Sequence, residues 1–114
     1  MGILDYFRQP PGLENLSPDQ VATRYREDGS VLIDVRSEYE FNRAHIPGAV
    51  SLPLGSIHKV SHSYEKNSDI ILICATGHRS RAAANSLIKN GFHRVSHLEG
   101  GMRSWRKANK SLEE

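Results

Sequence analysis

Apolar and polar positions along the chain fall into two patterns, short continuous apolar runs and mixed segments that open on helix-capping residues. The runs at 31–35 and 70–74 are almost entirely aliphatic, and most of their side chains are β-branched. Such runs are typical of strands that are buried on both faces of a sheet. Shorter segments that mix apolar and polar residues predict three further strands, at residues 13–16, 49–52 and 95–98.

Helix start signals stand between these predicted strands. Ser17 and Ser37 each precede a Gln or Glu by three residues, which is the pattern of a capping box. Ser80 is expected to cap a third helix, and residues 55–67 are expected to hold one or two helical turns and a loop. The predicted helices cover approximately residues 18–27, 38–44, 81–90 and 102–108.

The order of these elements predicts the fold class. Strands that alternate with helices along a whole chain indicate an α/β fold, in which helices cover both faces of a parallel sheet. The length of 114 residues fits one domain. Its bounds are predicted at 13–109, after an irregular lead-in over 1–12 and before a polar tail over 110–114 that is expected to be frayed.

Charge and cysteine content narrow the function classes. Fifteen Lys and Arg against thirteen Asp and Glu give a net charge of +2, too small and too scattered for a nucleic-acid partner. We also expect no membrane partner, because no apolar run is long enough to span a bilayer and the N-terminus does not resemble a signal peptide. A single cysteine excludes an intramolecular disulfide and fits a reducing compartment, so a cytoplasmic location is expected.

Cys74 is the strongest candidate for chemistry. It ends the most apolar predicted strand, and ligands of open α/β sheets bind beyond the carboxyl ends of the strands. The loop after it contains Gly77, which can adopt positive φ, and Arg79, which adds positive charge. Loop N–H groups can converge into an anion-binding nest, and the following helix N-terminus adds positive potential.

These features favour a thiolate over a thiol at Cys74, and they would also stabilise the anionic outer sulfur of a persulfide. A thiolate formed in this way attacks a sulfur donor without a general base. The competing interpretation is an inert apolar cysteine at the end of a strand. The composition of the loop that follows Cys74 disfavours that interpretation.

Three segments resemble the signatures of the single-domain rhodanese family. Residues 74–80 match its active-site loop, Cys-x-x-Gly-x-Arg-Ser, residues 34–49 resemble its first signature, and residues 98–105 resemble its last, Gly-Gly-x-x-x-Trp. The resemblance implies a five-stranded parallel sheet and a sulfurtransferase that cycles through a persulfide on Cys74. It implies neither a cofactor nor a metal.

The resemblance also implies roles for residues around the cysteine. The substrate cradle would be formed by Ala75, Thr76, Gly77, His78, Arg79 and Ser80. Asp34 and Arg36 match family positions that support the active site. A direct contact between these two is not expected, on the view that they point to opposite faces of the strand.

The donor and the acceptor of sulfur stay open at this point. Thiosulfate, mercaptopyruvate and a small-molecule or protein persulfide are candidate donors, and cyanide or a thiol is the candidate acceptor. Ala75 and Thr76 stand where thiosulfate-preferring members often carry a basic side chain, which disfavours thiosulfate.

Two alternative functions compete with sulfur transfer. A phosphatase is disfavoured because Arg79 comes one residue too early for the Cys-x5-Arg loop of phosphatases on this scaffold. A non-catalytic rhodanese-like module for protein docking or regulation is disfavoured because Cys74 is present and its loop is intact.

Overall fold

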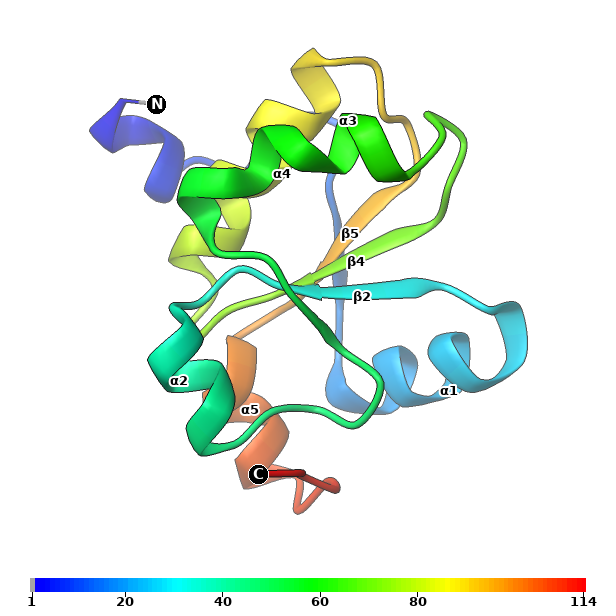
Figure 1. Ribbon diagram of the computed structural model, residues 1–114, viewed down its shortest axis with the longest axis vertical. Helices are drawn as coiled ribbons and strands as arrows, with labels where there is room; N and C mark the ends of the chain where they lie inside the picture. The colour runs from blue at the N-terminus through cyan, green and yellow to red at the C-terminus, as the bar shows by residue number, and fades with distance from the viewer. Residues whose placement is uncertain (1) are drawn as a thin grey trace.

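The computed structural model describes residues 2–114, and within them five parallel strands form one sheet (Figure 1). The order across the sheet is β1-β5-β4-β2-β3, so β4 is central. Each strand lies within one of the predicted runs, which confirms the predicted α/β fold. The strands are β1 (Glu14–Leu16), β2 (Val31–Asp34), β3 (Val50–Ser51), β4 (Ile70–Ile73) and β5 (Val95–Leu98).

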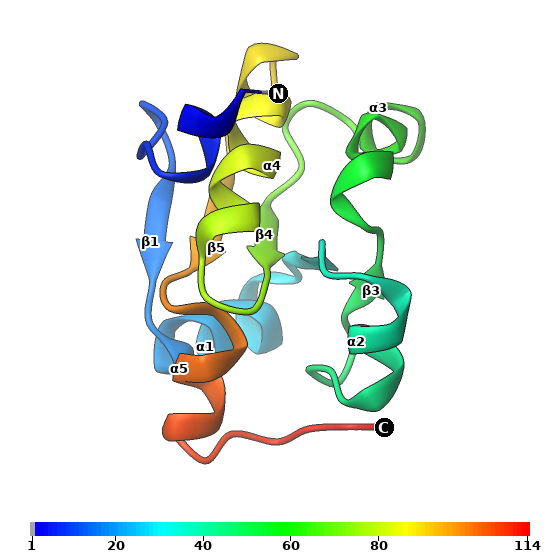
Figure 2. The same ribbon diagram turned by 90° about the vertical axis from the view of Figure 1, so that its left-hand side faces the viewer.

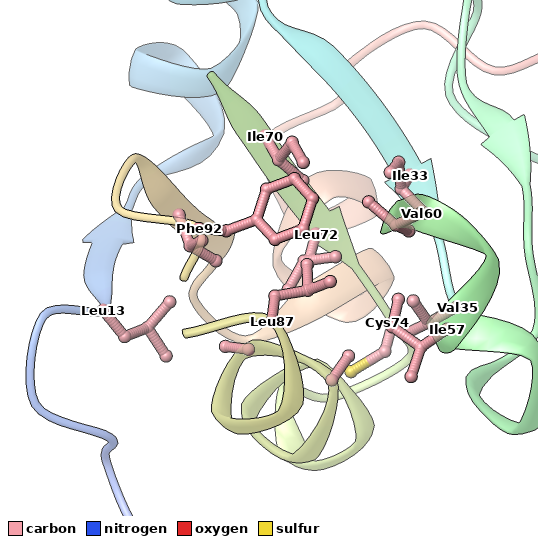
Figure 3. Close-up of a cluster of buried hydrophobic side chains, with 13 residues drawn as sticks. Leu13, Ile33, Val35, Ile57, Val60, Ile70, Leu72, Cys74, Leu87 and Phe92 are labelled. Carbon is pink, nitrogen blue, oxygen red and sulfur yellow. The ribbon is translucent and has the colours of Figure 1, made fainter. Parts of the chain in front are cut away.

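Helices cover both faces of the sheet, as the alternation of elements predicts. Because side chains alternate along a strand, Ile70, Leu72 and Cys74 enter one apolar cluster, and Ile71 and Ile73 enter the other. Figure 3 shows the first cluster, in which Cys74 lies near the end of β4. The first cluster lies under α3 (Val60–Ser63) and α4 (His78–Lys89), and the second under α1 (Pro18–Asp28) and α5 (Gly101–Lys107).

Both predicted capping boxes are present. The N–H of Gln20 donates to Ser17 Oγ at the start of α1, and the N–H of Ser17 donates to Gln20 Oε1. Ser37 and Glu40 make the same reciprocal pair at the start of α2 (Glu38–Arg43). Each box satisfies N–H groups that the first helical turn leaves without a partner, and so it fixes where the helix begins.

The polar stretch between β3 and β4 is more ordered than its composition suggests. It forms a 3₁₀ helix, η2 (Leu54–Lys59), that continues directly into α3. Ile57 and Val60 are almost completely buried and pack in the same apolar cluster as Cys74. Leu54 and Tyr64 pack against this cluster as well, so apolar contacts along the whole segment hold it against the sheet.

The predicted start of α4 is wrong by three residues. The helix begins at His78 with Gly77 as its N-cap, and Ser80 does not cap it. Gly77 adopts a φ of 104°, a conformation that side chains rarely permit, and this lets the chain turn into a helix directly after the loop. Ser80 is instead buried in the first turn.

Both ends of the described chain pack against the domain. The lead-in contains a 3₁₀ turn, η1 (Ile3–Tyr6), and the Phe7 ring lies 5.3 Å from the His78 ring. The tail is not frayed as predicted, because Glu113 exchanges two backbone hydrogen bonds with His45, each 2.8 Å long. Figure 2 shows this C-terminal segment running from α5 back toward α2. Across residues 2–114, none of the helices has the length and apolarity needed to cross a membrane.

Candidate active site

Cys74 lies at the carboxyl end of the central strand, with only 1% of its surface exposed. The N–H of Gly77 donates to its sulfur at 2.9 Å. A backbone donor aimed at the sulfur favours the anionic form. The donor belongs to the glycine that turns the loop, and it is one of the loop N–H groups that the sequence analysis expects to converge.

The loop after Cys74 is held from behind by α5. The carbonyls of Cys74 and Ala75 accept hydrogen bonds from the N–H groups of Met102 and Arg103, at 2.7 and 3.1 Å. Because the carbonyl and the N–H of a peptide group point in opposite directions, the N–H groups of Ala75 and Thr76 face away from α5. The closing helix thereby orients the peptide groups of the loop.

Gly101 makes this close approach possible. A Cβ atom at this position would lie 2.3 Å from the Cys74 carbonyl oxygen and 2.6 Å from the Ala75 carbonyl carbon. Its φ of 59° is also in the left-handed region. The second glycine of the Gly-Gly signature is therefore required by the contact between α5 and the loop.

Arg79 does not extend freely into the loop. Its guanidinium makes a bidentate ion pair with the carboxylate of Glu40 on α2, with N–O distances of 2.6 and 2.9 Å. The hydrogen bond from Arg79 is the main reason that the pKa of Glu40 falls to about 2, and the same bond raises the pKa of Arg79. Much of the positive charge expected at the loop is thus balanced by a carboxylate, and the pair ties α4 to α2.

Asp34 and Arg36 do form a direct ion pair, contrary to the prediction. Arg36 donates to Asp34 from both Nε and Nη2, at 2.8 to 3.2 Å, and both side chains are buried. Residues two apart on a strand share a face, so the reasoning from opposite faces was wrong. Arg36 Nη2 also donates to the carbonyl of Ala44, so the ion pair fixes the position of the residue that follows α2.

Ser80 lies behind the sulfur and reaches a histidine that the sequence analysis missed. Its Oγ is 3.5 Å from Cys74 Sγ and 2.6 Å from Nδ1 of His97 on β5. Burial is the main reason that the pKa of His97 falls to about 4, with a further contribution from the charge of Arg81. The signal in the sequence was a histidine within a predicted strand, since the carboxyl ends of parallel strands lie at the active-site edge.

A cleft of about 590 Å³ opens beside the loop between α2 and α5. Three of its arginines, Arg43, Arg103 and Arg106, make no ion pair with any described residue. The cleft is therefore electropositive at its rim, and it reaches the loop at Ala75 and Thr76. The lining residues are Arg36, Tyr39, Glu40, Arg43, Ala44, Ala75, Thr76, Met102, Arg103 and Arg106.

The predicted cradle residues therefore lie in different surroundings. Gly77 contacts the sulfur through its backbone and Ser80 through its hydroxyl, while Ala75 and Thr76 line the cleft. The ring of His78 is exposed, and its Nδ1 lies 3.3 Å from Thr76 Oγ1.

Comparison with known proteins shows the family to which this chain is similar. Residues 17–108 match the family model of the rhodanese-like domain. The thiosulfate sulfurtransferase GlpE of Pseudomonas syringae is 35% identical over 89 residues, which cover 78% of this chain and 84% of GlpE. YrkF of Bacillus subtilis, named as a candidate sulfur carrier protein, is 42% identical over 74 residues, or 65% of this chain. The match spans only 40% of the length of YrkF.

A solved structure also shares the fold. The rhodanese-like domain of an Anabaena protein superimposes with a TM-score of 0.81 and 29% sequence identity. The superposition covers 87% of this chain and 77% of the Anabaena chain. The similarity therefore extends over most of this chain's fold.

Proposed function

Because this chain belongs to the rhodanese-like domain family, we propose that it transfers sulfane sulfur through a persulfide on Cys74. The observation that carries the proposal is the Gly77 N–H aimed at the buried Cys74 sulfur, at the carboxyl end of the central strand. The thiosulfate sulfurtransferase name of a relative that aligns over most of its own length supports the same reaction class.

The first half-reaction loads the cysteine. The Cys74 thiolate attacks the outer sulfur of the donor and forms a new S–S bond. With thiosulfate as donor, the original S–S bond breaks and sulfite leaves with its electron pair. The product is Cys–S–S⁻, whose outer sulfur is anionic and is stabilised by N–H groups of the loop.

The second half-reaction discharges the persulfide. An acceptor thiolate or cyanide attacks the outer sulfur, the persulfide S–S bond breaks, and Cys74 leaves as a thiolate. The chain has no second cysteine, so the acceptor must be another molecule. No general base is needed if the attacking and leaving groups are both thiolates.

The cleft supports an anionic donor. Arg43, Arg103 and Arg106 supply positive charge from α2 and α5, although Ala75 and Thr76 give the loop none. Thiosulfate, which the loop alone disfavours, and a persulfide with carboxylate groups both fit this charge. We further propose that the protein works in a reducing, cytoplasmic setting, because its one cysteine must stay reduced to accept sulfur. We propose no nucleic-acid partner, because the net charge is only +2.

The persulfide is tested by intact mass after incubation with thiosulfate. We expect a gain of one sulfur, about 32 Da, that maps to Cys74 and is removed by cyanide, because an activated thiolate accepts sulfane sulfur. A gain with a small-molecule or protein persulfide but not with thiosulfate would keep the proposal and change the donor. No gain from any donor would favour a non-catalytic docking module.

The role of the cleft is tested by charge reversal. We expect Arg103→Glu with Arg106→Glu to raise the KM for thiosulfate about tenfold and to change kcat far less, because both charges attract the donor without touching the sulfur. The control with the same change in charge is Arg26→Glu with Lys89→Glu, on exposed surfaces of α1 and α4 outside the cleft. Equal KM values in both variants would exclude the cleft as the donor site.

A further inference from the structure

A continuous chain of hydrogen bonds leads from the N-terminal segment to the imidazole of His97. Gln9 Nε2 donates to the Leu13 carbonyl at 2.9 Å and to Asn15 Oδ1 at 3.0 Å. The same Asn15 oxygen lies 2.8 Å from His97 Nε2. Each contact constrains the next, because a backbone carbonyl can only accept a hydrogen bond.

These contacts fix the tautomer of His97. The Leu13 carbonyl requires the amide nitrogen of Gln9, and that nitrogen requires the oxygen of Asn15 to face it. An amide oxygen accepts, so His97 Nε2 must carry a hydrogen. In the neutral imidazole, Nδ1 is then without a hydrogen and can only accept.

The direction of the Ser80 hydroxyl follows from the tautomer. Its oxygen lies 2.6 Å from His97 Nδ1 and 3.0 Å from the Gly77 carbonyl, and it has one hydrogen to give. If that hydrogen pointed to Gly77, two lone pairs would meet at 2.6 Å between Ser80 and His97. The hydroxyl therefore donates to His97, and it stays so while His97 is neutral, above its lowered pKa of about 4.

The consequence reaches the sulfur. With its hydrogen given to His97, Ser80 presents only lone pairs to Cys74 Sγ, 3.5 Å away, and so accepts the thiol hydrogen. This contact opposes the Gly77 N–H, which favours the thiolate. We propose that His97, acting through Ser80, is a positioning residue that holds resting Cys74 in the thiol form. Its part in sulfur transfer rests on the proposed function.

Such a restraint has a use in a protein with one cysteine. A thiolate is oxidised much more readily than a thiol, and the chain has no second cysteine with which an oxidised Cys74 could form a recoverable disulfide. The restraint limits the reactive form in the sulfur-free protein. Sulfur loading then draws on the fraction that ionises, so a variant without the restraint loads faster at neutral pH.

Charged groups from the neighbouring elements also face this chain of contacts. On α4, Arg81 acts on His97, and Arg79 acts on Cys74 while paired with Glu40 of α2. The buried Asp34–Arg36 pair lies at the end of β2. Because the variants below leave all of these groups in place, a shift in thiol reactivity reports on Ser80 and His97.

The decisive measurement is the rate of carbamidomethylation of Cys74 by iodoacetamide as a function of pH, followed by intact mass. His97→Phe frees the Ser80 hydroxyl to donate to a thiolate. We expect the midpoint of the rate profile to fall by about one pH unit, the size of one hydrogen bond to a charged group. When His97→Phe is added to a Ser80→Ala variant, the midpoint should not fall, because no hydroxyl is left to donate to the sulfur. A midpoint in His97→Phe equal to or above that of the unsubstituted protein would overturn the proposal.

A second variant avoids replacing a buried ring. Asn15→Asp places a carboxylate against His97 Nε2 and favours the doubly protonated ring, whose Nδ1–H donates to Ser80. Ser80 is then free to donate to sulfur, so the midpoint should fall here too once ¹⁵N NMR shows the ring doubly protonated at that pH. An unchanged midpoint with a doubly protonated ring would contradict the proposal. In the unsubstituted protein, ¹⁵N NMR should show the Nε2–H tautomer of His97, and the Nδ1–H tautomer would refute it. Alkylation needs no sulfur transfer, so these results stand apart from any failure of the persulfide test.

Discussion

Cys74→Ser is expected to keep its fold and to lose sulfur transfer completely. A serine hydroxyl is not ionised at neutral pH and cannot form a persulfide, so thiocyanate production from thiosulfate and cyanide should fall to the rate of buffer alone. No other residue can take over, because the chain has no second cysteine.

The fold should tolerate this change because the new hydroxyl has partners. The N–H of Gly77 lies 2.9 Å from the present sulfur and can donate to a serine oxygen, and Ser80 is also adjacent. We expect the free energy of unfolding to change by no more than about 2 kcal/mol, measured by urea denaturation. Sulfur transfer that survives in a folded Cys74→Ser protein would refute the persulfide mechanism.

Gly101→Ala is expected to damage both stability and activity. The added Cβ would lie 2.3 Å from the Cys74 carbonyl oxygen, so α5 and the loop must separate. That movement breaks the hydrogen bond from the Met102 N–H to the same oxygen. Left-handed strain and the clash together should cost about 2–5 kcal/mol, and the displaced loop should lower kcat more than tenfold.

A matched glycine separates the two causes. Gly29 has a φ of 68°, close to the 59° of Gly101, but a Cβ at Gly29 would meet nothing within 4 Å. Gly29→Ala should therefore show the cost of left-handed strain alone, about 1 kcal/mol, with normal activity. Urea denaturation and thiocyanate assays on both variants measure the difference, and equal losses in both would show that the contact with the loop is unimportant.

The sheet could be predicted because burial on both faces leaves a direct trace in the sequence. The runs at 31–35 and 70–74 contain few polar residues, and both proved to be interior strands of the sheet. The capping boxes at Ser17 and Ser37 were equally readable, since each is a contact between residues three apart. The start of α4 was misplaced because Gly77, as a helix N-cap, competes with the more common cap at Ser80.

Most of the site could not be predicted because its contacts join residues far apart in the chain. Arg79 meets Glu40 across 39 positions, and His97 meets Asn15 across 82. No local pattern in the sequence identifies such pairs, because the two residues come together only when the strands and helices have packed. The arginine-rimmed cleft is of the same kind, because its two walls come from α2 and α5. The Asp34–Arg36 pair, by contrast, was readable from its spacing.

The docked tail brings the C-terminus to the rim of the cleft. Glu113 pairs with His45, the residue next to Ala44, which lines the cleft. A sulfur acceptor joined to Glu114 by a short flexible linker would share this neighbourhood, at an effective concentration in the millimolar range. Sulfur would then pass within one molecule at a rate that does not depend on protein concentration. The same acceptor joined at the opposite edge of the sheet would have no such advantage.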